Sequence, residues 1–545
     1  MAAVTRIDRA EFASVVGSGL ILFAGALMSA GSLCFLTGHG LQRANAPIAL
    51  ALAGAAVWRA TRLLERRARL LAIGAVVAVV VLGCLVERVF YDESWDGQDY
   101  HQLAVDALSR GWNPIAAQRE PDSYFRNAWL NHYPKGAWSS TASLFLVIRN
   151  MEAAKAMNLV LMAGVFLLGL GYFLREQPLR RWQALLLAAL IALNPVAVCQ
   201  LFTNYVDGLT ASALAATLLA YAEALARPRL WARLVLVAAL IVALNLKFTC
   251  TIYTVLIACG LGLHALVRWR QRRPLVVAIG AGVLLGIFVV GYQPYVTNWA
   301  RFGNPLYPVA SKGNRFDASF FVLGAVQPDF LRRSRFAKLG LSLLARSAND
   351  PKDTAVRLKF PLAVSTSEWR VFESCDVRLG GFGPLFGALF LLSAALLATM
   401  ARNQRLALTL AVLLLGTVLI NPEPWWARYT PQLWLIPIVA IAAAWRVRSK
   451  YVRGMGIALA LLALVDVVGV GAVSVVTDLR NSNQTRHALG HLQWRGAEVA
   501  VFVSVPGVLR LLDDRHIRYR RVEQAKSIRC PQPITRFNEW DGCGQ

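Results

Sequence analysis

Apolar runs recur along almost the whole of this chain, and they constrain its fold more than any other feature. Each run is about 20 residues long, which is enough for a helix to cross the hydrocarbon core of a membrane. Water does not reach that core, so the backbone N–H and C=O groups of a spanning segment this apolar have to pair within a helix. The sequence therefore predicts an all-α polytopic membrane protein.

We expect about thirteen transmembrane helices. Their approximate bounds are 13–36, 43–58, 69–90, 153–174, 182–201, 207–226, 230–246, 250–267, 275–295, 382–399, 405–421, 430–445 and 454–476. The composition agrees with this interpretation, because only 16% of the 545 residues are charged, whereas a soluble protein has about 25%.

The basic residues are distributed as expected for the cytoplasmic loops of a membrane protein. Lys and Arg number 57 against 31 Asp and Glu, a formal net charge of +26 that by itself could suggest a nucleic-acid partner. The positive charges instead gather in short connections between apolar runs, at 59–70, 227–234, 268–274 and 445–453. The positive-inside rule places such connections in the cytoplasm. We therefore expect them to orient the chain, and we predict no nucleic-acid partner.

The same alternation sets the expected domains. With the N-terminus in the cytoplasm, the loops 91–152 and 296–381 and the tail 477–545 fall outside. We expect residues 1–476, with these loops, to form the transmembrane domain and 477–545 to form a small extracytoplasmic domain. In that tail, VAVFVSVPGVLRLL at 499–512 predicts a strand followed by a helix, and hence a small α/β segment.

Two short helices are expected in the first outer loop. In FYDESWDGQDYHQLAVDALSRG (90–111), apolar residues recur at helical spacing from Tyr100 onward, and Gly111 supplies a C-terminal stop. That helix would be amphipathic and would lie on the outer membrane surface. AWSSTASLFLVIR (137–149) is too short and too rich in Ser and Thr to span comfortably. We predict that it forms an interfacial helix beneath the loop.

The carboxylates ahead of the first of these helices form a candidate site. Asp96 could be the N-cap of the helix, with Asp99 in the position of the usual Glu of a capping box. Alternatively, Asp96 projects toward a cavity as a general base. Asp92 and Glu93 lie next to it, and carboxylates that lie close together repel, which raises the pKa of one of them. Carboxylate oxygens could also hold a divalent metal ion. These alternatives stay open at this stage.

Cations follow later in the chain. His132 and Lys135 flank a Tyr-Pro turn in the first outer loop, where the histidine has either a structural or a functional role. Lys247 ends a span on the outside, against the positive-inside bias, and either snorkels or pairs with an anion. Arg428 lies at the mouth of another span, among prolines and tryptophans, where it either pairs with Glu423 or binds a phosphate bidentately.

Carboxylates and cations on the same outer side favour one kind of chemistry. A hydroxyl or amine can attack a lipid-linked phosphosugar if a carboxylate takes its proton and cations stabilise the departing phosphate. The sequence contains no glycine-rich nucleotide-binding loop. None is required if the sugar donor is a lipid outside the cytoplasm.

The order and sidedness of these residues resemble those of the membrane-embedded GT-C glycosyltransferases, in particular the bacterial enzymes related to protein mannosyltransferases and lipid A aminoarabinose transferases. In that family the first outer loop has an acidic residue, a Tyr one turn later and then A-x-x-(Leu/Met)-x-x-G. Asp96, Tyr100, Ala104, Leu108 and Gly111 fall on this pattern here, loosely at its end, because three residues instead of two separate Ala104 from Leu108. The family's Tyr-Pro-Pro turn is similar to Tyr133-Pro134-Lys135. The segments NWARFGNPLYPV (298–309) and Ala427-Arg428-Tyr429 also resemble parts of this group.

The resemblance implies a GT-C-like helical bundle, a polyprenyl-phosphate sugar donor, an inverting displacement and an envelope glycan, lipid or protein as acceptor. It also implies a bacterial cytoplasmic membrane protein with its active site on the extracytoplasmic face. The implied roles are catalysis by Asp96, with Asp92 and Glu93 as alternatives, donor-phosphate binding by Arg428, Lys247 and Tyr429, and substrate binding by Tyr100, His132 and Lys135. Relatives commonly have Asp-Glu at the base position, whereas Gly97 follows Asp96 here. Relatives also differ in their use of a divalent metal ion, so the cofactor stays open.

Two other functions compete with this interpretation. An O-antigen-type ligase or polymerase would place its essential groups in the loop 296–381, with its arginines Arg332, Arg333, Arg335 and Arg346. A lipid or sugar transporter would need charges buried within the spans, where Asp466 is the main one.

Overall fold

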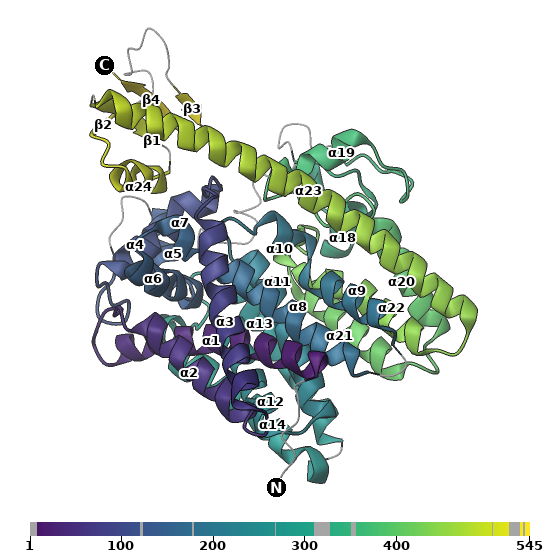
Figure 1. Ribbon diagram of the computed structural model, residues 1–545. Coiled ribbons are helices and arrows are strands. Elements are labelled where there is room, and N and C mark those ends of the chain that lie inside the picture. Colours follow the sequence, from purple (N-terminus) through teal and green to yellow (C-terminus); the bar gives the residue numbers. More distant parts are fainter. Residues whose placement is uncertain are drawn as a thin grey trace.

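The computed structural model describes residues 8–119, 124–176, 179–267, 269–309, 328–349, 356–496, 498–503, 505–522, 535–537 and 540–544. These residues form a helical bundle with a small sheet beyond one of its ends (Figure 1). Seven helices, counted with their short continuations, are long and apolar enough to cross a membrane. They contain α1 (Arg9–Leu36), α3 (Arg66–Glu87), α8 (Met157–Leu174), α11 (Asp207–Ala226), α13 (Phe248–Leu266), α14 (Trp269–Leu285) and α23 (Lys450–Arg495). The predicted helical, polytopic membrane architecture is confirmed.

Shorter apolar helices complete the bundle and fall on the remaining predicted spans. They are α2 (Asn45–Ala60), α9 (Arg181–Ala192), α12 (Leu230–Leu244), α20 (Phe386–Thr399), α21 (Arg405–Ile420) and α22 (Leu435–Arg446). Close packing comes from small residues, because Gly17 of α1 has no room for a side chain against the backbone of α8 at Gly164 and Leu168.

Several predicted spans are interrupted near one end. The span predicted at 182–201 stops at Ala192 and resumes as α10 (Pro195–Cys199). Asn194 caps the second piece by accepting a hydrogen bond from the Val196 N–H at 3.0 Å. The span predicted at 430–445 begins as the 3-10 turn η6 (Pro431–Trp434). Proline explains both breaks, since it lacks an N–H and clashes with the preceding turn.

The helix predicted at 137–149 exists as α6 (Gly136–Ile148), but it is buried in the bundle and not exposed on its surface. Every residue from Gly136 to Leu146 is buried. Ser139 approaches α1 so closely that a side-chain carbon on Gly31 would lie 3.1 Å from its Cβ. The Ser and Thr residues that argued against a membrane span instead permit close packing inside the bundle.

The first outer loop contributes the π-helical turn η1 (Gly97–His101), α4 (Gln102–Ser109), α5 (Tyr124–His132) and α7 (Met151–Ala154). The predicted helix after Tyr100 is therefore present, although it packs on α6 with Ala104, Ala107 and Leu108 buried. The second long loop contributes α15 (Thr297–Phe302), α17 (Pro328–Leu331), α18 (Arg335–Leu344), α19 (Thr366–Arg370) and the 3-10 turn η4 (Val371–Glu373).

The predicted strand and helix in the C-terminal tail are β1 (Val499–Val503) and α24 (Gly507–Asp514). Strands β2 (Tyr519–Arg521), β3 (Thr535–Phe537) and β4 (Trp540–Gly544) complete a sheet of order β2-β1-β4-β3. β1 pairs in parallel with β2 and antiparallel to β4. The predicted domain boundary at 476/477 falls inside α23, which continues to Arg495.

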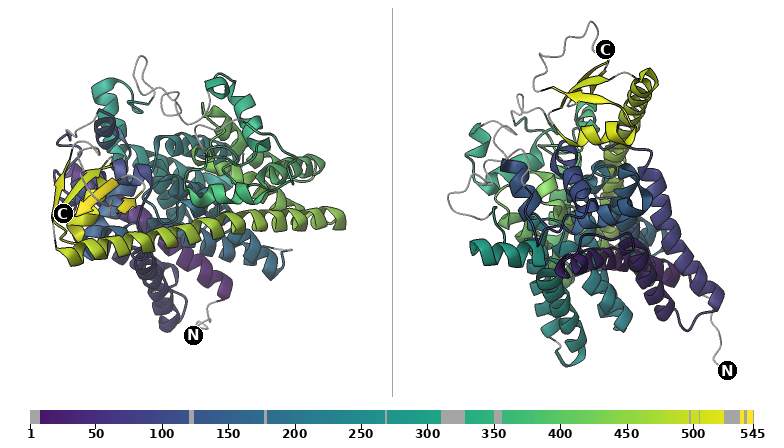
Figure 2. Two further views of the ribbon diagram at one scale, coloured as in Figure 1. Left: turned by 90° about the horizontal axis from the view of Figure 1, so that it is seen from above. Right: turned by 90° about the vertical axis from the view of Figure 1, so that its left-hand side faces the viewer.

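This C-terminal unit lies over the helices of the first outer loop (Figures 1 and 2). Gly507 at the start of α24 has no room for a side chain, because the carbonyl oxygen of Gln98 would lie 2.5 Å away. Arg510 also pairs with Asp106 of α4 at 2.7 Å. The tail is thus joined to the segment that contains Asp96.

Candidate active site

Arg428 lies between two carboxylates that are far from it in the sequence. Its Nη1 is 3.1 Å from Oδ2 of Asp96 and 3.4 Å from Oδ2 of Asp376. Asp96 directly precedes η1, Asp376 follows η4, and Arg428 lies in the 3-10 turn η5 (Ala427–Tyr429). Asp376 was not among the predicted site residues. The sequence around Asp376, FESCDVRLG (372–380), contains no pattern that predicts a contact with Arg428. The two side chains come together only in the tertiary structure.

Aromatic rings surround the guanidinium of Arg428. Its central carbon lies 4.8 Å from the ring centroid of Trp426, 5.2 Å from that of Tyr205 and 5.4 Å from that of Tyr429. Such contacts hold a cation in place while leaving its N–H groups available. Among the described residues, the buried Nε of Arg428 has no hydrogen-bond acceptor. The side chain therefore has a donor to spare for an anionic ligand.

The charge state of this cluster follows from its surroundings. Burial alone would lower the pKa of Arg428, but Asp376 and Asp96 outweigh it and raise this pKa well above its ordinary value. Burial raises the pKa of Asp376, although Arg428 opposes the change. Burial also raises the pKa of Tyr429 to about 12. The site therefore presents a permanent cation beside protonated phenols.

A second ion pair borders the first. Lys247, which precedes α13, has its Nζ 2.5 Å from Oδ1 of Asp207 at the start of α11. The same Nζ lies 4.7 Å from the ring centroid of Tyr429. The ring of Tyr429 thus contacts two cations, Lys247 and Arg428. The three residues predicted to bind the donor phosphate are brought together by the fold.

The polypeptide around Arg428 is held in a defined conformation. Pro424 and Pro431 bracket the segment and prevent a continuous helix from α21 into α22. The hydroxyl of Tyr253 donates a 2.7 Å hydrogen bond to the carbonyl of Tyr429. The predicted alternative pairing of Arg428 with Glu423 is wrong, because Glu423 accepts from Lys338 at 2.5 Å.

The predicted capping box at Asp96 is also wrong. Asp96 has a helical backbone, with φ −60° and ψ −33°, and its side chain makes no capping hydrogen bond. An N-cap residue requires extended backbone angles. Asp99 accepts a 2.7 Å hydrogen bond from Arg126 instead. The Asp96 carboxylate is about a quarter exposed, at 23%, and is directed at Arg428.

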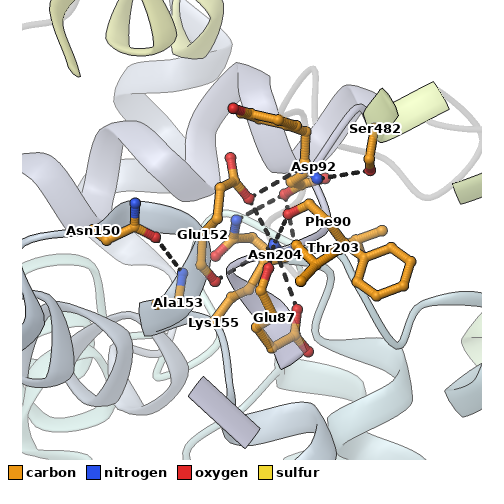
Figure 3. Close-up of polar contacts among 12 residues, drawn as sticks. Glu87, Phe90, Asp92, Asn150, Glu152, Ala153, Lys155, Thr203, Asn204 and Ser482 are labelled. Carbon is orange, nitrogen blue, oxygen red and sulfur yellow. Dashed lines mark hydrogen bonds and ion pairs between the residues drawn. The ribbon is translucent and has the colours of Figure 1, made fainter. Parts of the chain in front are cut away.

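Asp92 lies in a separate, fully buried network (Figure 3). Its Oδ1 accepts from the N–H and the hydroxyl of Ser94 at 3.0 and 2.5 Å. Its Oδ2 accepts from the N–H and the side-chain amide of Asn204 at 2.8 and 2.7 Å. Four donors thus occupy this carboxylate. Gly97 is required beside it, because a side-chain carbon there would lie 2.3 Å from Oδ2 of Asp92.

The same network fixes the end of α3. Figure 3 shows Lys155 between Glu87 and Glu152, with its Nζ 2.6 Å from Glu152 Oε2 and 3.4 Å from Glu87 Oε2. Lys155 also donates to the carbonyl of Phe90 at 2.7 Å, and Glu152 accepts from the N–H of Asp92 at 3.1 Å. These bonds position the chain where it leaves α3 for the loop that contains Asp96.

Glu93 points away from Arg428 toward the C-terminal part of α23. Its carboxylate accepts from the hydroxyl of Thr485, and burial raises its pKa. Of the three predicted catalytic carboxylates, the described contacts bring only Asp96 to Arg428.

We predict that Asp92→Asn lowers stability, by about 2–4 kcal/mol, because an amide N–H₂ would face one of the donor pairs on Ser94 or Asn204. Thermal unfolding of the purified protein measures this effect. Asp96→Asn is the matched substitution, and we expect it to change stability by less than about 1 kcal/mol since its ion pair is partly exposed. Equal melting temperatures for Asp92→Asn and the wild type would contradict the structural role.

Tyr100 belongs to an aromatic cluster of the first outer loop. Its ring centroid lies 4.3 Å from that of His101, 5.9 Å from that of Trp129 and 6.3 Å from that of Trp138. Burial and then the charge of Asp96 raise the pKa of Tyr100 well above its ordinary value. Tyr100 therefore lies at the border of the Arg428 cluster as a protonated phenol.

His132 and Lys135 have partners of their own. His132 Nδ1 is 2.8 Å from Oδ1 of Asn298, and its ring packs edge-on against Phe302 and Tyr307. Lys135 is buried, donates to the carbonyl of Tyr133 and lies 5.1 Å from the ring centroid of Trp138. Burial lowers its pKa well below the ordinary value. No described contact joins either side chain to Asp96 or Arg428, so their role in substrate binding stays a prediction.

His101 gives the protein an acid-sensitive group. Trp138 Nε1 donates to His101 Nδ1 at 2.6 Å, which requires that nitrogen to be unprotonated, and burial lowers the pKa of His101 from 6.5 to about 3. Because unfolding restores the higher pKa, its contribution is present above pH 6.5 and is lost as pH falls toward 3. We expect thermal stability to fall over this range. His101→Gln should show a shallower fall, and an equal slope in both proteins would contradict this assignment.

Residues on which the alternative functions depend lie elsewhere. Arg332, Arg333, Arg335 and Arg346 are exposed, and no described contact joins them to the Arg428 cluster. Asp466 is buried in α23 and accepts a 2.9 Å hydrogen bond from the N–H of Leu385, ahead of α20. Within the described part of the chain, no group of three or more His, Cys, Asp or Glu side chains is placed to hold a metal ion. The use of a divalent metal ion, which the sequence left open, is not tested by these contacts.

Comparison with solved structures shows a likeness at the level of the fold. The chain is similar to the crystal structure of ArnT from Cupriavidus metallidurans in the apo state, with a TM-score of 0.44 and 15% sequence identity. The superposition covers 82% of this chain and 85% of that chain. No family profile and no curated protein sequence matches the chain.

Proposed function

We propose that this protein is a GT-C-type membrane glycosyltransferase that moves a sugar from a polyprenyl-phosphate donor to an acceptor of the cell envelope. The convergence of Asp96, Arg428 and Lys247 at one end of the helical bundle carries this proposal. A carboxylate next to two cations is the set of groups that such a transfer requires. The motif resemblance of the loop around Asp96 supports the same reaction class.

The proposed reaction is a single displacement at the anomeric carbon of the sugar. The acceptor hydroxyl or amine attacks this carbon while Asp96 takes its proton, and the bond from the carbon to the phosphate oxygen breaks. The new bond forms on the face opposite the departing phosphate, so the anomeric configuration inverts. Polyprenyl phosphate leaves with the bonding electron pair, and Arg428 and Lys247 stabilise its negative charge.

The ion pair between Asp96 and Arg428 fits a role in both steps. While paired, the Asp96 carboxylate is held by the guanidinium. A phosphate that takes over the N–H groups of Arg428 would free this carboxylate for the acceptor. Asp376 would keep the guanidinium in position, because it also accepts a 2.7 Å hydrogen bond from Trp426 Nε1. Donor binding would then precede activation of the acceptor.

We propose that the site faces away from the cytoplasm of a bacterial cell. The basic connection 59–70 lies at the start of α3, and Asp96 follows the other end of this helix. The basic connection 227–234 lies between α11 and α12, at the ends away from Asp207 and Lys247. Basic connections stay in the cytoplasm. A lipid-linked donor suits that location.

The deciding experiment is a transfer assay with the purified protein in liposomes. Polyprenyl-phosphate sugars labelled in the sugar are supplied together with envelope lipids and glycans, and label in the acceptor fraction is measured. We expect transfer from a lipid-linked donor and none from nucleotide sugars. Transfer from nucleotide sugars alone would contradict the proposal, as would its complete absence with a full panel of lipid-linked sugars and acceptors.

A further inference from the structure

A polar cavity of about 370 Å³ lies between the C-terminal unit and the first outer loop, apart from the Arg428 cluster. Its walls come from the residues after α3, the start of α7, the C-terminal part of α23 and the end of α24. In Figure 1, α7 and α24 lie at the end of the bundle where the sheet lies. A cavity of this volume is within the range of small-ligand sites.

The charges in the wall leave the cavity positive. Arg88, Arg486 and Arg515 line it, and in the described part of the chain no carboxylate lies within ion-pair distance of any of them. Each of the two wall carboxylates has a cation partner outside the cavity. Glu152 pairs at 2.6 Å with Lys155, which Glu87 shares, and Asp514 pairs at 3.0 Å with Arg510, which Asp106 shares. The three arginines of the wall outnumber its two carboxylates.

The arginines are positioned and still have donors to spare. Arg515 Nη2 donates to the hydroxyl of Tyr91 at 2.9 Å. Arg486 donates to the carbonyl of Val89 and to Oδ1 of Asn483, both at 2.6 Å. Each guanidinium has five N–H groups, so several remain for a ligand. Planar arginine forks bind phosphate bidentately, which makes a phosphate the best-matched occupant.

We propose that this cavity is a binding site for a phosphate group, distinct from the donor site at Arg428. The site lies just past Glu87, where the candidate span of α3 ends, and this is the level at which lipid phosphates are found. A phospholipid headgroup and a soluble phosphate ester could both supply the group. The site is independent of glycosyl transfer, because its evidence is the cavity and its unpaired arginines.

Occupancy would act on the segment that contains Asp96. Tyr91, which contacts Arg515 in the cavity wall, is followed directly by Asp92, whose carbonyl accepts from Gln98 of η1 at 2.8 Å. A bound phosphate would draw α24 and the end of α23 toward the residues after α3. The ligand would therefore stabilise the contact between the C-terminal unit and the first outer loop.

The test measures binding to the full-length protein. Calorimetry with inorganic phosphate is done in phosphatidylcholine nanodiscs, and native mass spectrometry counts the phosphatidylglycerol that the protein retains. The variants are Arg88→Gln, the double variant Arg486→Gln/Arg515→Gln and, as a control, Arg520→Gln. Arg520 is an exposed residue of β2 in the same unit, and it does not line the cavity. Arg88 is exposed and has no described side-chain hydrogen bond, so we expect its replacement to remove a charge and to leave the fold intact.

We expect the wild type to bind at least one of the two probes. The double variant should bind at least about tenfold more weakly, because two charge-assisted hydrogen-bonding groups are lost. Arg88→Gln should weaken binding less, and Arg520→Gln should match the wild type. Retention of phosphatidylglycerol identifies a lipid headgroup as the occupant, whereas binding of inorganic phosphate alone identifies a soluble phosphate. Wild-type protein that binds neither probe, or equal binding by wild type, Arg88→Gln and the double variant, would overturn the proposal.

Discussion

Replacing Asp96 by Asn should lower the rate of sugar transfer by about 10²- to 10⁴-fold, the usual contribution of a positioned general base. The amide of Asn has nearly the same shape as the carboxylate and can still accept a hydrogen bond from Arg428, but it cannot take a proton from the acceptor. Donor binding should change little. Steady-state rates with a labelled polyprenyl-phosphate sugar measure the effect.

Asp99→Asn is the matched control for this experiment. It removes a carboxylate from the π-helical turn η1, which directly follows Asp96. The Asp99 carboxylate contacts Arg126 and has no described contact with Arg428. We expect its transfer rate to stay within a few-fold of the wild type. If Asp96→Asn and Asp92→Asn both transferred sugar at the wild-type rate, neither Asp96 nor Asp92 could be the base.

Replacing Arg428 by Gln should weaken donor binding by about 10- to 100-fold, because a charged, bidentate contact with the phosphate is lost. The rate at saturating donor should fall less than the affinity. The donor affinity of Arg428→Lys should lie between those of Arg428→Gln and the wild type, because lysine keeps the charge but not the planar guanidinium. Equilibrium binding of the donor lipid, measured together with kcat and KM, separates these effects.

Stability needs its own control for Arg428. Its removal leaves the partly exposed carboxylates of Asp96 and Asp376 without their common cation, which we expect to cost about 1–3 kcal/mol of stability. The double variant Arg428→Gln/Asp376→Asn should regain much of this stability without regaining donor affinity. Arg370 is an exposed residue of α19. Arg370→Gln should have the stability and the donor affinity of the wild type. Unchanged donor affinity in Arg428→Gln would remove its proposed role.

Several errors of prediction have a common cause. The segment 137–149 has the composition of a surface helix, yet Ser139 and its neighbours pack inside the bundle because α1 presents Gly31 to them. Asp96 and Asp99 have the spacing of a capping box, but Arg428 and Arg126 bind their carboxylates instead. In both cases the helix predicted from the local pattern is present. The contacts of its side chains, however, are made with residues outside that pattern.

The roles of the neighbouring carboxylates show the same limit. Asp92, Glu93 and Asp96 lie within five positions of one another. The fold directs Asp92 to Asn204, Glu93 to Thr485 and Asp96 to Arg428. Asp92 thus belongs to a buried structural network, Glu93 to the contact with α23, and Asp96 to the candidate active site.

The sequence by itself determined the helical, membrane-spanning architecture and the presence of helices in the first outer loop. It could do so because lipid forces every apolar span to satisfy its backbone locally, so that helix formation depends on composition within each segment. The tertiary structure alone decided which carboxylates pair with Arg428. Asp96 and Arg428 are 332 residues apart, and Asp376 is identified as a partner of Arg428 only by their contact in the fold. Charge pairing of this kind acts over a few ångströms in space, and no local pattern in the chain records it.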